Sequence, residues 1–383
     1  MKIAFDNIDL GSSNGDSVYA TGLVRALAAT FTGDEYEVFT FWSRKRRTRE
    51  TIGALPAVRI RSILPHPLVM GKAFRPAVEA LNDRLLRRAI DRADLYHCTN
   101  PVHFAFGTRN PVVTILDLIA LRQEEWVPRG SKEFYHKNIG RVIAESRIVF
   151  TISNHSRADI LHHFPGAEDK IVVTYLGIDE RFRRLPVADR SFLNAFGYPA
   201  KHPPFLLYVG ETQPRKNVHG LIAAFAELPV TVRKNMHLVI VGDSRRHDYR
   251  EALFALVREK NVQDVVHFYR GVSHDDLVRF YNAAHAFVFP SFYEGFGIPV
   301  VEAMQCGCPV LTSATSSLPE AGGNAALYVD PGDTDALKEK IRQIMEDHDL
   351  RSSLREKGFL QAARFTWKRT AELTYEGYRK IAP

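Results

Sequence analysis

The chain has 383 residues, of which 45% are hydrophobic and 25% charged, and its formal net charge at pH 7 is +7. These are ordinary values for a globular protein, and the length exceeds what one hydrophobic core usually organises, so we expect two domains. No apolar run approaches the ~18 residues that cross a bilayer, and the N-terminal apolar stretch ends at Asp6, which disfavours a transmembrane helix or a signal peptide. An odd number of cysteines (Cys98, Cys306 and Cys308) suits a reducing compartment, so we expect a cytoplasmic protein.

Short apolar runs alternate with segments of helical period along the whole chain. The strand-like runs are 3–5, 36–41, 112–116, 148–152, 205–209, 238–241, 265–269 and 286–289. The helix-like segments are 18–29, 78–90, 132–144, 221–228, 249–260, 277–284, 334–345, 350–363 and 367–381. Because most of the strand-like runs are apolar throughout, the pattern predicts an α/β protein whose parallel sheets are covered by helices on both faces.

The alternation is interrupted once, between Asp179 and Pro204, where the chain is polar and rich in proline. We interpret this segment as the link between two doubly wound, Rossmann-like domains that face a shared cleft, with bounds of 1–182 and 183–365. Ligands of such folds bind at the carboxyl ends of the strands. No G-x-G-x-x-G follows a strand, which removes the main support for a dinucleotide-dependent dehydrogenase.

Polar residues follow the first strand of the N-terminal half. The loop Gly11–Ser17, with Gly15 and Asp16, could direct backbone amides at a diphosphate, or it could be an ordinary turn in which Ser or Asp caps the next helix. Both interpretations remain open. The candidates for handling a second substrate, each of which could instead be structural, are Asp117, His97 and His103.

Positive charge is most concentrated at Arg44–Arg49, directly after Phe41 and Trp42. Five basic residues are near the lower end of the roughly four to eight that lipid recognition uses. The run is either a solvated loop or a contact with an anionic membrane surface, which would place the protein peripherally on the inner face of the membrane. Nucleic acid is not expected, because the chain has no zinc-finger spacing, heptad repeat or aromatic RNA-binding signature.

A loop rich in polar residues follows the strand 205–209. Arg215 and Lys216 lie in this loop, where two cations could bind a diphosphate and neutralise it as a leaving group. The alternative is a pair of ordinary surface cations. Asp347 and Asp349 have a spacing that some metal-dependent transferases use, but they lie in a charged junction between helices, which we interpret as a solvated linker. We therefore expect neither a metal nor a resident cofactor.

The stretch SFYEGFGIPVVEAMQCGCPV, Ser291–Val310, places two glutamates around a glycine-rich turn between a strand and a helix that Pro299 would begin and Gly307 would end. The glycines allow close approach of a ligand, and free N–H groups at a helix start bind anions, so we expect a phosphate here. Glu294 could hold the hydroxyls of a sugar and Glu302 those of a ribose. Alternatively, Glu302 only complements the helix dipole and Glu294 is a solvated turn residue.

Together these motifs resemble the donor-binding signature of the retaining glycosyltransferases of family four, which have the glycosyltransferase-B fold. Glu294 and Glu302, separated by seven residues, match the paired-glutamate motif, and VGETQPRKNVHGLIAAF at 209–225 matches the phosphate-binding loop. The likeness is closest to the mannosyltransferase-like branch that builds bacterial surface polysaccharides. It covers nearly the whole chain, is strongest from Gly210 to Pro331 and is diffuse before Thr151.

The resemblance implies metal-independent transfer, with retention, of a hexose such as mannose or glucose from a GDP- or UDP-sugar to a glycan or a lipid-linked saccharide. It also implies that Gly242, Asp243 and Val272 line the base pocket and that the last helix, 366–383, crosses back to the first domain. We assign catalytic roles to Arg215, Lys216, Glu294 and Asp117. We assign donor binding to Gly15, Asp16, Gly210, Gly242, Val272, Gly295, Phe296, Gly297, Ile298 and Glu302.

One position departs from the family pattern. Family members commonly have a His-Asp pair after the strand in the middle of the first domain, and here Leu116 precedes Asp117. The departure concerns the acceptor side and leaves the donor half intact. It motivates one alternative, a nucleotide-sugar-binding subunit that transfers nothing. A further alternative, which does not rest on this position, is another nucleotide-sugar enzyme on the same architecture, such as a 2-epimerase.

Overall fold

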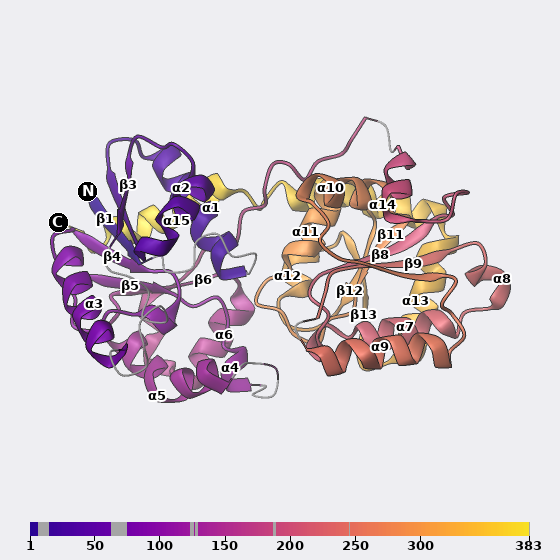
Figure 1. The fold of residues 1–383 in the computed structure, drawn as a ribbon, viewed down its shortest axis with the longest axis horizontal. Coiled ribbons are helices and arrows are strands. Elements are labelled where there is room, and N and C mark those ends of the chain that lie inside the picture. Colours follow the sequence, from indigo (N-terminus) through magenta and orange to yellow (C-terminus); the bar gives the residue numbers. More distant parts are fainter. Residues whose placement is uncertain are drawn as a thin grey trace. The chain divides into compact units, whose positions relative to one another are not determined.

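The computed structural model describes residues 1–6, 15–62, 75–122, 126, 129–186, 189–244 and 246–382. The chain forms two compact units, which are described in turn: Met1–Gly177 together with Thr366–Pro383, and Ile178–Phe365 (Figure 1). The polar segment 179–204 belongs to the second unit. The side-chain amide of Asn282 holds this segment by accepting from the backbone N–H of Leu185 and donating to the carbonyl of Arg183.

The first unit is built on a parallel sheet with the order β3-β2-β1-β4-β5-β6-β7. Its strands are β1 (Lys2–Asp6), β2 (Glu35–Thr40), β3 (Val58–Ser62), β4 (Leu95–Cys98), β5 (Pro111–Thr114), β6 (Ile148–Thr151) and β7 (Ile171–Val173). Its α-helices are α1 (Gly15–Thr30), α2 (Lys45–Ile52), α3 (Arg75–Ile90), α4 (Ile119–Arg122), α5 (Arg129–Glu145), α6 (Asn154–His163) and α15 (Trp367–Arg379). Short 3-10 turns are η1 (Trp42–Arg44), η3 (Pro101–His103) and η5 (Pro165–Lys170). The strands β4, β5 and β6 are buried at every position. The apolar runs 112–116 and 148–152 predict this for β5 and β6, whereas β4 was not predicted from the sequence.

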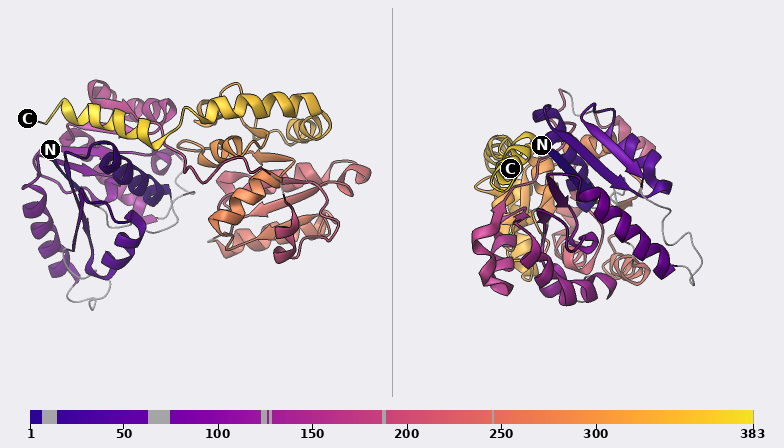
Figure 2. Two further views of the ribbon diagram at one scale, coloured as in Figure 1. Left: turned by 90° about the horizontal axis from the view of Figure 1, so that it is seen from above. Right: turned by 90° about the vertical axis from the view of Figure 1, so that its left-hand side faces the viewer.

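The C-terminal helix α15 packs on the first unit beside α1 (Figure 2). Two glycines make this close approach possible, because a Cβ atom on Gly22 or Gly177 would overlap Trp367. Further along α15, the ring of Tyr375 stacks on Phe31 with centroids 3.7 Å apart. The helix is thus held by Trp367, which fits against two glycines, and by the stacked pair of Tyr375 and Phe31.

The second unit is built on a parallel sheet with the order β10-β9-β8-β11-β12-β13 (Figure 1). Its strands are β8 (Phe205–Val209), β9 (His237–Val241), β10 (Val266–Tyr269), β11 (Ala286–Phe289), β12 (Val310–Ser313) and β13 (Ala326–Val329). Its α-helices are α7 (Val218–Ala226), α8 (Val230–Arg233), α9 (His247–Glu259), α10 (His274–Ala283), α11 (Ile298–Gln305), α12 (Leu318–Gly322), α13 (Thr334–Glu346) and α14 (His348–Ala362). The 3-10 turns are η6 (Ser191–Phe196) and η7 (Pro214–Lys216).

Both sheets are doubly wound, which confirms the predicted fold class. The strand order reverses direction between β1 and β4 in the first sheet and between β8 and β11 in the second. Loops that leave neighbouring strands at such a reversal point run to opposite faces of the sheet and open a crevice at the carboxyl ends. The residues that follow β1 and β4, and those that follow β8 and β11, are therefore where binding groups should lie.

The basic run forms helical structure, so its interpretation as a loop was wrong. Residues 42–44 form η1 and residues 45–52 form α2. The helix α2 has one buried face and one basic face, because Thr48 and Ile52 are buried while Arg46, Arg47 and Arg49 are exposed. In the part of the chain that the structure describes, no helix combines the length and the hydropathy needed to cross a bilayer.

Candidate active site

Three of the residues assigned from the sequence meet in the second unit. Arg215 and Lys216 lie in η7, which follows β8, and Glu294 lies in the turn between β11 and α11. The Nη1 atom of Arg215 is 3.0 Å from Oε2 of Glu294, and Nζ of Lys216 is 2.8 Å from its Oε1. The side chains of Arg215, Lys216 and Glu294 are only 17%, 12% and 11% exposed. The turn after β8 and the turn after β11 are therefore joined by a nearly buried cluster of two cations and one carboxylate.

Main-chain hydrogen bonds fix the two turns against each other. The backbone N–H of Phe292 donates to the carbonyl of Arg215 at 2.9 Å, and the guanidinium of Arg215 donates to the carbonyl of Tyr293 at 2.6 Å. The hydroxyl of Ser291 donates to Oε1 of Glu294 at 2.7 Å, so the carboxylate is oriented from its own turn as well. Such fixed donors cost little reorganisation when charge changes nearby.

The electrostatics of the cluster favour a charged Glu294. Burial by itself would raise the pKa of this carboxyl, but the charges of Arg215 and Lys216 and the hydrogen bonds from Lys216 and Ser291 outweigh it and lower the pKa to about 2. Two cations share one carboxylate, so the three side chains carry a net positive charge. A positive charge in a site with little exposure to water is a strong attractor for an anion.

The helix α11 begins where the sequence predicts an anion site. Gly297 caps it with φ of 111°, a conformation that side chains rarely adopt, and a Cβ atom there would come within 2.8 Å of Leu318. Ile298 is the first helical residue and Pro299 the second, so the predicted start at Pro299 is shifted by one position. Gly295 and Phe296 are buried in the turn.

Glu302 lies on α11, one turn into the helix. Its side-chain hydrogen bond is made with Tyr281 and not with the cluster of Arg215, Lys216 and Glu294. Its Oε2 atom accepts a hydrogen bond from the hydroxyl of Tyr281 on α10 at 3.0 Å. Burial, and to a smaller extent the charge of Asp179, raise the pKa of Glu302 to about 7, although the hydrogen bond from Tyr281 acts in the opposite direction. The two glutamates of the motif thus have opposite electrostatic environments.

The glycines assigned to donor binding lie at the ends of β8 and β9. Gly242 has φ of 150°, and a Cβ atom on it would overlap the carbonyl oxygen of Gly210, so the two loops touch through their backbones. The amide of Thr212 donates to the carbonyl of Asp243 at 2.9 Å, which continues this pairing. Val272 follows β10 at the next strand end and is half-buried.

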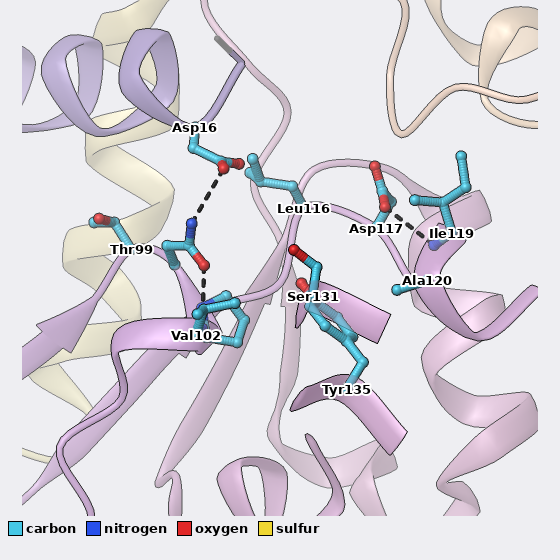
Figure 3. A pocket seen from close by; sticks show the side chains of 11 residues that line it. Asp16, Thr99, Val102, Leu116, Asp117, Ile119, Ala120, Ser131 and Tyr135 are labelled. Atoms are coloured by element: carbon cyan, nitrogen blue, oxygen red, sulfur yellow. Dashed lines mark hydrogen bonds between the residues drawn. The ribbon is translucent and has the colours of Figure 1, made fainter. Parts of the chain in front are cut away.

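The first unit contains a pocket of about 180 Å³ at the carboxyl ends of β4 and β5 (Figure 3). Its lining residues are Asp16, Thr99, Asn100, Pro101, Val102, Leu116, Asp117, Ile119, Ala120, Ser131 and Tyr135. Two assigned residues, Asp16 and Asp117, therefore share one pocket, and Leu116 lines it as well. Gly15 is the exposed first residue of α1 and is not part of the lining, while residues 11–14 of the predicted loop lie outside the described residues.

Short polar contacts order this pocket. The side-chain amide of Asn100 donates to Oδ2 of Asp16 at 3.1 Å, and its oxygen accepts from the backbone N–H of Val102. Oδ1 of Asp117 accepts from the backbone N–H of Ile119 at 3.1 Å, which places the carboxylate at the start of α4. Asn100 thus bridges the end of β4 to the first turn of α1.

His97 has a structural position and is not among the pocket-lining residues. It is fully buried between the hydroxyl of Tyr378, 2.5 Å from Nδ1, and the hydroxyl of Thr114, 2.8 Å from Nε2. Burial lowers the pKa of His97 to about 3, so the ring is neutral. The same Thr114 hydroxyl lies 2.7 Å from that of Tyr19, and the chain of contacts ties α15 and α1 to the sheet.

Several side chains that position the sites were not identified from the sequence. Ser291 lies inside the glutamate motif, three residues before Glu294. A serine at this spacing can donate a hydrogen bond to the glutamate, so the local sequence could have indicated this contact. Asn100 follows β4, a strand too short to stand out, and Tyr135 lies in a helix that carries no motif. Tyr281 precedes Glu302 by 21 residues, and no sequence pattern predicts their contact.

Comparison with known proteins decides the family. Residues 193–361 match the family model for glycosyl transferases group 1, and residues 13–182 match that for glycosyltransferase family 4. An Escherichia coli protein named O-antigen chain mannosyltransferase B is 32% identical over 293 residues, which cover 75% of this chain and 74% of that protein. The chain belongs to glycosyltransferase family 4. The family predicted from the motifs is confirmed, and the chain is a transferase of the mannosyltransferase-like type.

Further relatives and solved structures agree with this assignment. The E. coli serotype-specific mannosyltransferase WbdA is 27% identical over 254 residues, which cover 65% of this glycosyltransferase but only 31% of WbdA. The crystal structure of Anabaena HepE in complex with UDP and glucose superposes with a TM-score of 0.79 at 18% identity, covering 99% of this chain and 100% of that one. Sucrose-phosphate synthase from Thermosynechococcus elongatus gives 0.78 at 25% identity, with 99% and 98% covered. The glycosyltransferase-B fold is therefore established.

Proposed function

We propose that this glycosyltransferase moves a hexosyl residue, mannose or glucose, from a GDP- or UDP-sugar to a saccharide acceptor, with retention at the anomeric carbon and without a metal. The relatives named mannosyltransferases favour mannose, and the O-antigen chain in one of those names favours a glycan of a bacterial surface polysaccharide as the acceptor. The observation that carries the proposal is the cluster of Arg215, Lys216 and Glu294 in the positions of the donor-binding motif.

The cluster can serve a departing diphosphate by exchange of partners. Phosphate oxygens that enter the site replace Glu294 as the ion-pair partner of Arg215 and Lys216, and they bring the negative charge that the net positive cluster lacks. As the glycosidic bond to the diphosphate breaks, charge grows on the leaving oxygen, and both cations and the amides at the start of α11 stabilise it. Glu294, released from the cations, is then available to accept hydrogen bonds from sugar hydroxyls.

This role predicts the effect of removing each charge. A charge-assisted hydrogen bond made in the transition state is worth about 1.5–3 kcal/mol, which is roughly tenfold to a hundredfold in rate. Lys216→Ala and Glu294→Ala should each lower kcat/KM at least roughly tenfold, measured by release of nucleoside diphosphate with a competent donor and acceptor. Lys234→Ala removes an exposed lysine from the same unit and serves as the matched control. Turnover like that of the parent protein in both site variants would contradict the assigned roles.

Metal independence and retention are tested separately. Because Arg215 and Lys216 supply the positive charge, transfer should persist in excess chelator, and loss of activity there with recovery on adding Mg²⁺ or Mn²⁺ would refute this part. Proton NMR of the first product formed from an α-linked donor should show an α-linked sugar. A β-linked product would refute retention.

A protein that binds a nucleotide sugar but transfers nothing is the second candidate, because Leu116 lines the pocket of the first unit where the family commonly has a histidine. A panel of nucleotide sugars, offered with and without saccharide acceptors, separates the candidates. Binding without release of nucleoside diphosphate would favour the inactive protein. Conversion of the donor sugar without an acceptor would instead indicate a 2-epimerase.

Association with an anionic membrane is proposed for the surface of η1 and α2, which suits a lipid-linked acceptor and a peripheral location on the cytoplasmic face. Trp42 is 72% exposed there, and Arg46, Arg47 and Arg49 point to solvent beside it. A basic residue near an anionic bilayer contributes about 1 kcal/mol, so replacing Arg47 and Arg49 by Gln should weaken binding to phosphatidylserine vesicles by about thirtyfold. Binding that is absent, or that does not weaken in high salt, would contradict the proposal.

A further inference from the structure

The pocket of the first unit has the size and the lining of a site for one sugar ring. A volume of about 180 Å³ equals that of roughly six waters in the liquid, and one pyranose ring with its hydroxyls takes up a similar volume because its atoms are bonded to one another. One part of the lining is apolar, with Val102, Leu116, Ile119 and Ala120, and can face the C–H groups of such a ring. The rest presents polar groups that can pair with hydroxyls, as binding sites for small molecules usually do.

Among the residues that the structure describes, the charged groups of the lining are two carboxylates. Asp16 comes from the first turn of α1 and Asp117 from the end of β5, and both reach the same pocket (Figure 3). Both carboxylates line the pocket together with Tyr135. Burial raises the pKa of the Tyr135 phenol, and the charges of Asp117 and Asp16 act in the same direction. Carboxylates accept hydrogen bonds from hydroxyls but repel phosphate groups.

The position of Asp16 also opposes a role with the donor diphosphate. A helix N-terminus attracts anions, and the first turn of α1 already carries the carboxylate of Asp16. Asn100 donates to that carboxylate and so holds it toward the end of β4, where the pocket lies. A diphosphate placed at the start of α1 would meet a fixed negative charge, whereas a sugar hydroxyl would meet a fixed acceptor.

We propose that this pocket binds the terminal sugar unit of the acceptor and that Asp16, Asn100 and Asp117 select an uncharged sugar over a phosphorylated one. The proposal rests on the proposed function, because it names the substrate class of the acceptor side. Asp16 and Asp117 accept hydrogen bonds from ring hydroxyls, Ser131 and the Tyr135 hydroxyl supply donors, and Leu116 provides an apolar contact in place of a polar group. The acceptor chain is therefore extended from a neutral sugar.

Ligand-observed NMR tests the binding. Methyl α-D-mannopyranoside and methyl α-D-glucopyranoside are the neutral probes, and the corresponding sugar 6-phosphates are the charged ones. In the presence of UDP or GDP, a neutral glycoside should bind at least tenfold more tightly than its phosphate. Asp16→Asn combined with Asp117→Asn should weaken the neutral glycoside at least tenfold and reduce the discrimination against the phosphate. Equal binding of neutral and phosphorylated sugars to the parent protein would overturn the proposal.

Matched variants separate recognition from folding. Asp169→Asn makes the same chemical change at an exposed position of the first unit and should leave glycoside binding unchanged. Tyr135→Phe keeps the ring and removes only the hydroxyl, so it should weaken the glycoside severalfold without a fall in the melting temperature. Glycoside binding that is unchanged in both Asp16→Asn and Tyr135→Phe would refute the assigned pocket.

The same samples distinguish failure of this inference from failure of the proposed function. Calorimetry with UDP and GDP reports the donor site of the second unit. If neither nucleotide binds, the proposed function fails. If a nucleotide binds and nucleoside diphosphate is released on transfer, but substitution of Asp16 or Asn100 does not change the binding of any neutral glycoside, then only the present inference fails. In active protein, the substitution Asn100→Ala should raise the KM for a neutral acceptor at least tenfold and change the Kd for the nucleotide less than twofold.

Discussion

Replacing Glu294 by glutamine should destabilise the second unit at neutral pH, because it leaves Arg215 and Lys216 facing each other without their shared counter-charge. The fall in the pKa of Glu294 from its usual 4.5 to about 2 corresponds to about 3 kcal/mol of folding free energy. Removing one partner of a buried ion pair generally costs about 3–5 kcal/mol, which is the same range. We therefore expect Glu294→Gln to lower the free energy of unfolding by about 3 kcal/mol.

The direction of the pH dependence follows from the same shift. A carboxyl whose pKa is lowered in the folded state contributes stability above its unfolded pKa, and this contribution is lost as the pH falls toward the folded value. The difference between the parent protein and Glu294→Gln should thus be full at pH 7, begin to shrink below about pH 4.5 and be small near pH 2. Added UDP or GDP should narrow the difference at pH 7, because the diphosphate replaces the missing negative charge.

The assay must report on the second unit. All three tryptophans, Trp42, Trp126 and Trp367, lie in the first unit, so tryptophan fluorescence would follow the wrong part of the chain. Amide hydrogen exchange in peptides that cover β11 and α11, read by mass spectrometry, gives the local free energy of opening directly. The reasoning is refuted if Glu294→Gln exchanges like the parent protein at pH 7, or if the loss is the same at pH 3.

The second glutamate provides a matched control. The pKa of Glu302 is raised to about 7, so its contribution is present below its usual 4.5 and is lost as the pH rises through about 7. Glu302→Gln should therefore leave stability nearly unchanged at pH 4 and make the protein relatively more stable than its parent at pH 8. If Glu302→Gln destabilised the protein at pH 7 as much as Glu294→Gln does, the loss of stability would come from removing any carboxylate and would not depend on the environment of that carboxylate.

Three further substitutions probe the frame around the sites. His97→Phe removes the hydrogen-bond partner of the buried hydroxyls of Tyr378 and Thr114, and should lower the free energy of unfolding in urea by about 1–3 kcal/mol. A neutral buried histidine makes the parent protein lose stability as the pH falls from 6.5, the usual pKa, to about 3. The variant should lack this part of the acid sensitivity. Gly242→Ala forces a Cβ against the backbone of Gly210 and should weaken binding of UDP or GDP in calorimetry; unchanged binding would remove this glycine from the donor loop. Gly22→Val should displace Trp367 and lower the free energy of unfolding of the first unit by about 1–3 kcal/mol or more. Tryptophan fluorescence should then change at a lower urea concentration than in the parent protein. An unchanged midpoint would show that α15 packs on the first unit without this contact.

Much of the fold could be predicted from local patterns. The all-apolar runs that became β5, β6, β8, β9 and β11 are buried at every position in the structure, and the helical periods gave the long helices within a few residues. The strand β3 was not identified, because its sequence Val-Arg-Ile-Arg-Ser contains no apolar run: half-buried positions alternate with exposed arginines, as in an edge strand. The basic run was interpreted as a loop because arginine and lysine carry no periodic apolar signal, although both favour helices.

The sequence by itself predicted the chemistry that we propose for the second unit, since a strand, a glycine turn and a helix start lie within some twenty consecutive residues, and local order places their side chains. Only the tertiary structure decided which distant groups meet. Arg215 and Glu294 are joined across 79 positions, His97 and Tyr378 across 281, and Asp16 and Asn100 across 84. Such contacts depend on how strands are ordered in a sheet and how closely helices approach it, and neither is encoded in the period of any one segment.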